Sequence, residues 1–181
     1  MTVSAPAFAA AVVPTLTPPA DATRSLAVSV SGYITPKCTV DTKDSDGSFG
    51  DITNRRTGVA DSVSLSLPFT MSCNSPYEAV LVSKNGALAY DGMTQSQFAS
   101  TVDYSAALDM SRIAGGVALR CDSDAMRGND GDRSSCRTNS ANDVASATGD
   151  GNIVLKLKPG ALPLLMGSYS DKLTLKLSPR V

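Results

Sequence analysis

The residues of this 181-residue sequence with the clearest chemistry are four cysteines, and the sequence contains no histidine. Histidine is the commonest general base, the commonest neutral metal ligand and the usual partner of a catalytic serine or cysteine. The sequence also has no paired acidic motif and no glycine-rich phosphate loop after a strand. We therefore predict a protein that is not an enzyme and that binds no cofactor.

An even number of cysteines without CxxC spacing favours disulfides over a zinc site. The alternative is a cytosolic protein with four buried free thiols. Four cysteines allow three connectivities, of which nearest-neighbour pairing is the simplest. We expect disulfides that involve Cys38, Cys73, Cys121 and Cys136, and the sequence leaves open whether the last two pair.

Two loops rich in aspartate and glycine raise the question of calcium. In the loop that contains Asp44, Asp46 and Gly47, the EF-hand register places Thr42 and Thr53 where Asp and Glu are needed. The second loop, 129–132, lacks the remaining ligands as well. Solvated turns explain both loops, so we predict no metal site.

The charge balance is close to neutral. There are 16 basic and 17 acidic residues, and the net charge is −1. No basic run is present, so nucleic-acid binding is not indicated.

The N-terminal segment, residues 1–22, is rich in Ala, Pro and Thr. Ala7-Phe8-Ala9 matches a small-x-small cleavage site, but no basic region or apolar run precedes it, so it is either a signal remnant or an accidental match. Its prolines exclude a helix or a central strand. We assign residues 23–181 to a single domain, and no stretch is long enough to span a membrane.

Apolar residues alternate with polar ones in several segments, as in half-buried strands. One such segment begins at Leu26 and keeps its parity as far as Cys38 and Val40. The clearest is 62–73, which carries Pro68 and therefore needs an edge or a bulge there. Because Cys38 and Cys73 both fall on the core side of their strands, we predict that they are bonded to each other.

Further short strands follow along the sequence, without a convincing amphipathic helix. Asn85-Gly86 predicts a turn between two of them. A long polar excursion covers 122–150. With seven or eight strands expected, the sequence predicts an all-β sandwich. The remaining expected strands are 79–83, its hairpin partner 88–90, and then 102–110, 115–121, 152–158 and 168–177.

The last expected strand has one apolar face and one polar face, because Leu173, Leu175 and Leu177 alternate with lysine and threonine. The sequence ends at Val181, so we expect that no later strand covers the free side of this one. An exposed edge of this kind is a liability unless something pairs with it. We expect the partner to be another copy of the same protein.

Several short motifs, taken in order, resemble pilin subunits of the chaperone–usher pathway. The similarity is to the archaic branch and to the related spore coat protein U-like domains, and it covers most of the chain from Leu26 to Leu177. The polar insertion around Cys121 and Cys136 departs from that pattern. The motifs are Val30 to Ile34 followed by Cys38-Thr39-Val40, then Phe49-Gly50-Asp51-Ile52, Val63 to Cys73, and Gly167 to Asp171 with the leucines after it.

This resemblance implies an immunoglobulin-like sandwich that lacks its final strand. In such proteins a periplasmic chaperone first lends a strand, which the N-terminal extension of the next subunit then replaces. The donor is expected within Ala10 to Ala22, with its apolar positions at Val12, Pro14 and Leu16. The acceptor groove is expected between two strands whose core-facing residues are Leu26, Val28 and Val30 on one side and Leu173, Leu175 and Leu177 on the other.

The resemblance further implies an exported subunit of a surface fimbria, with a periplasmic chaperone, an outer-membrane usher and other pilin subunits as partners. Its role would be adhesion to a host or abiotic surface, or biofilm formation. The alternatives are an exported carbohydrate- or surface-binding adhesin, which would use the polar region 122–150, and a coat protein of the same fold.

Overall fold

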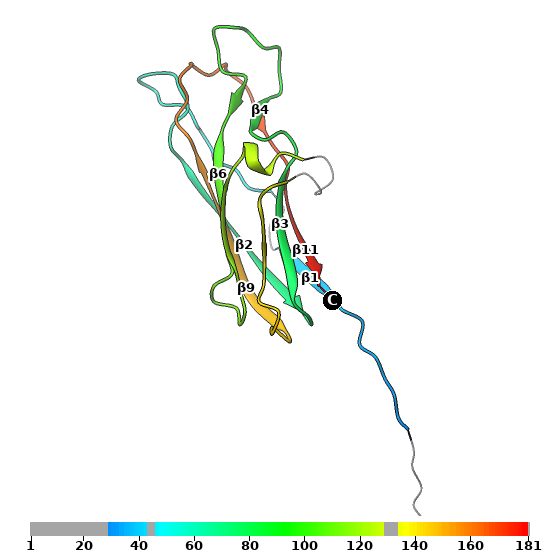
Figure 1. Ribbon diagram of the computed structural model, residues 1–181. Helices are drawn as coiled ribbons and strands as arrows, with labels where there is room; N and C mark the ends of the chain where they lie inside the picture. The colour runs from blue at the N-terminus through cyan, green and yellow to red at the C-terminus, as the bar shows by residue number, and fades with distance from the viewer. Residues whose placement is uncertain (1–28, 43–45, 129–133, 181) are drawn as a thin grey trace, which may run out of the picture. The chain divides into compact units, whose positions relative to one another are not determined.

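The computed structural model describes residues 29–42, 46–128 and 134–180 (Figure 1). The chain from Thr35 onward makes one compact unit, and the residues before it belong to a second. Within the second unit, residues 29–34 have no helix or strand. Five residues of the predicted donor and groove lie outside the described residues, so the structure does not bear on them: Val12, Pro14, Leu16, Leu26 and Val28.

The unit that begins at Thr35 is all-β. Its described residues contain no α-helix and one 3-10 helix, η1 (Asp124–Met126). Its strands are β1 (Cys38–Thr42), β2 (Ser64–Cys73), β3 (Tyr77–Ser83), β4 (Leu88–Tyr90), β5 (Thr101–Val102), β6 (Tyr104–Asp109), β7 (Ala118–Asp122), β8 (Arg137–Asn139), β9 (Ala147–Leu157), β10 (Tyr169–Ser170) and β11 (Leu173–Pro179).

The strands form antiparallel sheets arranged like a β-sandwich. One sheet has five strands in the order β1-β2-β9-β6-β7. Facing it are two three-stranded sheets, β11-β3-β8 and β10-β4-β5. They are joined by β3, which leads into β4, and by β10, which leads into β11. Figure 1 shows β2 and β9 side by side, with β3 and β11 in the other layer.

The alternation in β2 places its odd residues toward the core, as predicted. Phe69, Met71 and Cys73 are buried, whereas the even residues of the strand are exposed. On the opposite layer, Tyr77, Ala79 and Leu81 of β3 are fully buried. Burial of apolar side chains from both layers stabilises the fold, at about 25 cal/mol per Å² removed from water.

The N-terminal part of the fold differs from the sequence prediction. Of the strand expected from Leu26 onward, the described residues 29–37 are not in a strand, β1 begins at Cys38, and Val30 and Ile34 are 91% and 84% exposed. The reason is the pairing of β1 with β2, in which Cys38 lies opposite Cys73, the last residue of β2. Residues before Cys38 therefore have no β2 residue to pair with.

The expected hairpin between 79–83 and 88–90 does not form. Asn85-Gly86 makes the predicted turn, with Gly86 at φ +73. The segment 88–90 is a strand, but it pairs with β10 and β5 in the adjoining sheet and not with β3. The polar excursion 122–150 contains η1, β8 and the start of β9, which its composition concealed.

Two disulfides cross-link the unit, Cys38–Cys73 and Cys121–Cys136. They join residues 35 and 15 positions apart, which corresponds to roughly 4 and 3 kcal/mol of stabilisation in the chain-entropy model. Disulfides persist in oxidising compartments, so the two bridges fit an exported protein.

Candidate functional site

Two sheet edges lie next to each other on one side of the sandwich. β1 is the last strand of the five-stranded sheet, β11 is the last strand of the facing sheet, and the two are neighbours in space. In the part of the chain that the structure describes, each pairs with one strand only. The opposite side differs, because the Cys121–Cys136 disulfide ties β7 to the residue before β8.

A groove of about 600 Å³ lies at the start of β11, where Leu173 is part of its lining. We use the name groove for this hollow. Residues 47–53 form one wall, and residues 164–171 with Leu173 form the other. Its floor consists of apolar or aromatic side chains from four strands, namely Leu65, Leu67, Leu88, Tyr104 and Leu155.

The floor of the groove continues the inward face of β2. Among the described residues, β1 pairs with β2 from Cys38 opposite Cys73 to Thr42 opposite Phe69. The β9 ladder runs along the whole of β2, with Asn152 opposite Pro68, so Pro68 lies in an inner strand and not at the edge that the sequence allowed for. Beyond it, Leu65 and Leu67 are only half-buried, although Phe69 on the same face is 4% exposed.

The wall at 164–169 is held by two tyrosines. The Tyr169 hydroxyl donates to the carbonyl of Ala99 at 2.9 Å and accepts from the Leu165 N–H at 3.0 Å. The Tyr90 hydroxyl donates to the carbonyl of Met166 at 3.1 Å. Gly167 has φ +147, and a Cβ there would lie 2.7 Å from the Tyr90 ring. This wall is therefore fixed in position by side chains from β4 and β10.

The carboxylate of Asp171 is part of the lining of the groove. The Tyr104 hydroxyl donates to Asp171 at 2.6 Å, and the Ser83 hydroxyl donates to it at 2.5 Å. The backbone N–H groups of Asn85 and Lys172 donate to its other oxygen at 3.0 and 2.8 Å. Four donors on one carboxylate bind the β3–β4 turn to the start of β11, which keeps the groove wall in register.

The Tyr104 hydroxyl should make stability sensitive to alkaline pH. Burial, and then the hydrogen bond to Asp171, raise the pKa of Tyr104 above its ordinary value of 10.0. The native state therefore keeps this proton after the unfolded chain has begun to lose it. The stability that this provides is complete below pH 10 and falls as the pH rises above it.

We expect Tyr104→Phe to cost about 1 to 2 kcal/mol at neutral pH and to flatten the alkaline decline in stability. Urea unfolding at several pH values between 7 and 11 measures both effects. Burial also raises the pKa of Tyr77 and Tyr169, so part of the decline should remain. Tyr33→Phe is the control, because that side chain is 93% exposed. An unchanged alkaline decline in Tyr104→Phe would contradict this assignment.

The predicted acceptor residues separate into two groups. Leu173 lines the groove, while Leu175 and Leu177 follow it on the same face of β11 and are half-buried against the core. Val30 is exposed and outside any strand, and it belongs to the unit before Thr35, so its assignment to the acceptor stays a prediction. Residues 47–53 also line the groove, and they were not among the predicted acceptor residues.

Several groove residues were not singled out from the sequence. Leu65 and Leu67 belong to the clearest predicted strand, where the pattern gave them the same role as the buried residues after them. Tyr104 and Asp171 come together across 67 positions of sequence, so no local pattern indicates their contact.

The comparisons with known proteins found no match to any family model and none to a curated protein sequence. Among the described residues, no three His, Cys, Asp or Glu side chains are placed to hold a metal ion. A search of the same residues finds no helix that is both long enough and apolar enough to cross a membrane.

Proposed function

We propose that this protein is a structural subunit of a surface fibre, in which an N-terminal segment of one copy fills the groove of the next. The observation that carries the proposal is the groove itself, a hollow with an apolar floor at the start of β11, which pairs with β3 alone among the described residues. Addition of an extended strand to such an edge is a general mode of peptide recognition. It would also cover the exposed edges that otherwise favour aggregation.

The donor segment that we propose is Leu26 to Ile34. Its apolar residues Leu26, Val28, Val30 and Ile34 share one parity, with serines at 29 and 31 and Gly32 between them. Within its described part, Val30, Tyr33 and Ile34 are each more than 80% exposed. Large apolar side chains that alternate and find no core in their own unit are suited to a groove in another molecule.

The dimensions of the proposed donor match those of the acceptor. Nine extended residues span about 30 Å at roughly 3.3 Å per residue. β11, the edge beside which the donor would run, has seven residues. With a period of two, Val28, Val30 and Ile34 would face the leucines of the groove while Ser29 and Ser31 face solvent.

The complete fold in this proposal is an immunoglobulin-like sandwich whose final strand is supplied by the next subunit. The sequence resemblance to chaperone–usher pilins supports this reading, and it adds a periplasmic chaperone and an outer-membrane usher as assembly partners. The cross-linked cysteines agree with passage through an oxidising compartment. The finished fibre would lie on the cell surface and act in adhesion or biofilm formation.

The proposal is tested by refolding the oxidised chain at rising concentration and running it, unheated, on a denaturing gel. The full chain is compared with one variant that lacks Leu26 to Ile34 and with another that lacks Ala10 to Ala22. We expect a ladder of multimers that collapses on boiling, present in the full chain and in the second variant. The variant without Leu26 to Ile34 should run as a monomer.

Two other results would be informative. A ladder that depends on Ala10 to Ala22, and not on Leu26 to Ile34, would move the donor to the upstream segment. Monomers in all three samples at every concentration would contradict the fibre proposal and leave a self-contained sandwich. Electron microscopy of the multimers distinguishes thin fibres from the amorphous material expected of a coat protein.

A further inference from the structure

A chain with the proposed donor faces a competing reaction. Only three residues, Thr35 to Lys37, separate Leu26 to Ile34 from β1, and β1 has a free edge on the side of β11. Loops of three residues are common in antiparallel hairpins. The donor segment could therefore fold back along β1 of its own chain, and a chain that is closed in this way can neither donate nor accept a strand.

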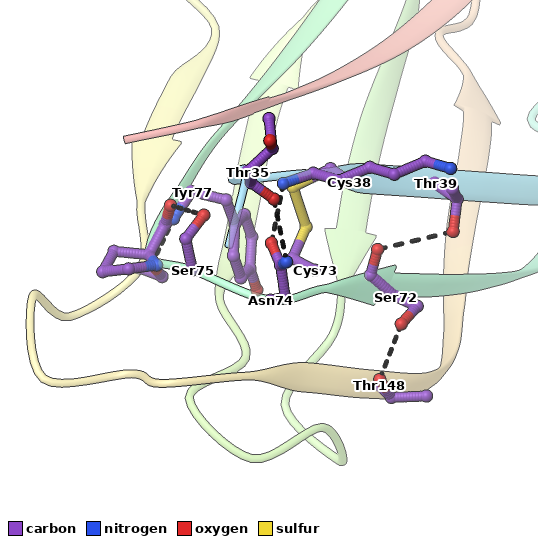
Figure 2. Close-up of a disulfide and its surroundings, with 12 residues drawn as sticks. Thr35, Cys38, Thr39, Ser72, Cys73, Asn74, Ser75, Tyr77 and Thr148 are labelled. Carbon is purple, nitrogen blue, oxygen red and sulfur yellow. Dashed lines mark hydrogen bonds between the residues drawn. A yellow bond between two sulfur atoms is a disulfide. The ribbon is translucent and has the colours of Figure 1, made fainter. Parts of the chain in front are cut away.

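The three linking residues are held by one side chain, Asn74, in the turn after β2. Its Nδ2 donates to the carbonyl of Thr35 at 3.1 Å, and its Oδ1 accepts from the Lys37 N–H at 2.6 Å. Its own backbone N–H donates to the Lys37 carbonyl at 3.1 Å. Figure 2 shows Asn74 beside Cys73 with its hydrogen bonds directed toward Thr35, and the Cys38–Cys73 disulfide fixes the residue that follows Lys37.

Pro36 lies inside this clamp and restricts it further. The proline ring fixes its φ near −65°, and the residue before a proline is confined to extended conformations. A hairpin turn over Thr35 to Lys37 would have to break both side-chain bonds of Asn74, because the Thr35 carbonyl and the Lys37 N–H would need new orientations. Asn74 thus opposes a hairpin turn at Thr35 to Lys37, the turn that would lay the donor segment along β1 of its own chain.

We propose that Asn74 is a positioning residue for assembly, which keeps the donor segment from closing the groove of its own chain and so directs it to another copy. This inference rests on the proposed function. It assigns to a surface asparagine a role in the choice between closed monomers and open subunits, separate from the groove residues that bind the donor. The loss of two hydrogen bonds should raise the equilibrium constant between open and closed monomers roughly tenfold in favour of the closed form.

The test uses a fluorescent peptide with the sequence of residues 26–34 and nanomolar protein, taken as the monomer fraction of a size-exclusion column. Peptide affinity is measured for the full chain, for Asn74→Ala and for the control Asn142→Ala, an exposed asparagine outside the clamp. We expect Asn74→Ala to bind the peptide severalfold, and at most about tenfold, more weakly than the other two, because its own segment competes for the groove. The same substitutions are then made in chains that lack residues 26–34, where all three should bind the peptide equally.

Each other outcome has a distinct meaning. Equal affinity for all three full-length chains would overturn the role of Asn74. Weaker binding by Asn74→Ala in the shortened chain as well would also overturn it, by showing that Asn74 only supports the fold of the groove. Failure of the shortened chain without further substitution to bind the peptide would contradict the proposed function itself.

Discussion

Val30→Asp should abolish multimers while leaving the compact unit folded. In the proposed fibre Val30 is buried in the groove of the next subunit, where a valine contributes about 1.5 to 3 kcal/mol. An aspartate in that apolar site would lose this contribution and would also bury an unpaired carboxylate. We expect strand exchange to weaken at least about a hundredfold, measured as the loss of the ladder on an unheated gel.

The matched control for Val30→Asp is Ser31→Asp, which adds the same charge one position later. In an extended donor, neighbouring residues point to opposite sides, so this aspartate would face solvent. Because Val30 is 91% exposed in its own chain, neither change should alter the thermal unfolding of the monomer. Equal loss of multimers in both variants would show that added charge, and not the buried face, is responsible. Multimers that persist in Val30→Asp would exclude this register.

The core of the fold was largely predictable, because it depends on a local period. Alternation in β2 identified both the strand and its inward face, and Phe69, Met71 and Cys73 are buried as expected. The placement of Cys38 and Cys73 on inward faces led to a pair that the structure joins across neighbouring strands. A period of two fixes the direction of a side chain within a strand, which is why these features follow from sequence.

The same pattern could not say where the apolar face of Leu26 to Ile34 is buried. Alternation in that segment predicts that one of its faces needs an apolar partner. A strand inside the sandwich and a strand donated to another molecule would both meet that need. The end of β2 bears on this question, since Cys73 lies opposite Cys38 and no β2 residue remains to pair with residues before Cys38. That limit is set by the register of two strands far apart in sequence, which composition and period do not contain.

Contacts across long stretches of sequence account for the other misses. The carboxylate of Asp171 meets Ser83 and Tyr104, and each is more than 60 positions away. β4 pairs with β10 and β5 where a local hairpin with β3 was expected, and β10 lies about 80 positions further along the sequence. The groove is the product of such contacts, so its walls could be recognised only once the strands were in place.

Leu173→Asp tests the acceptor side, and we expect it, like Val30→Asp, to abolish the multimers. Leu173 lines the groove at the start of β11, so a carboxylate there should repel an apolar donor and prevent its insertion. Thr174→Asp is the control, because the next residue of the strand faces the opposite side of the sheet. Since Leu173 also packs partly against the core, circular dichroism and urea unfolding must first show that the variant is folded.

Mixing the two defective chains gives the sharpest form of this test. Val30→Asp keeps a working groove and Leu173→Asp keeps a working donor, so a mixture can form one productive contact and no second. We expect each variant alone to remain monomeric and the mixture to give a dimer that resists unheated denaturing conditions. A long ladder from the mixture, or no complex at all, would contradict the assignment of donor and acceptor, because strand exchange through one donor and one groove permits a single junction.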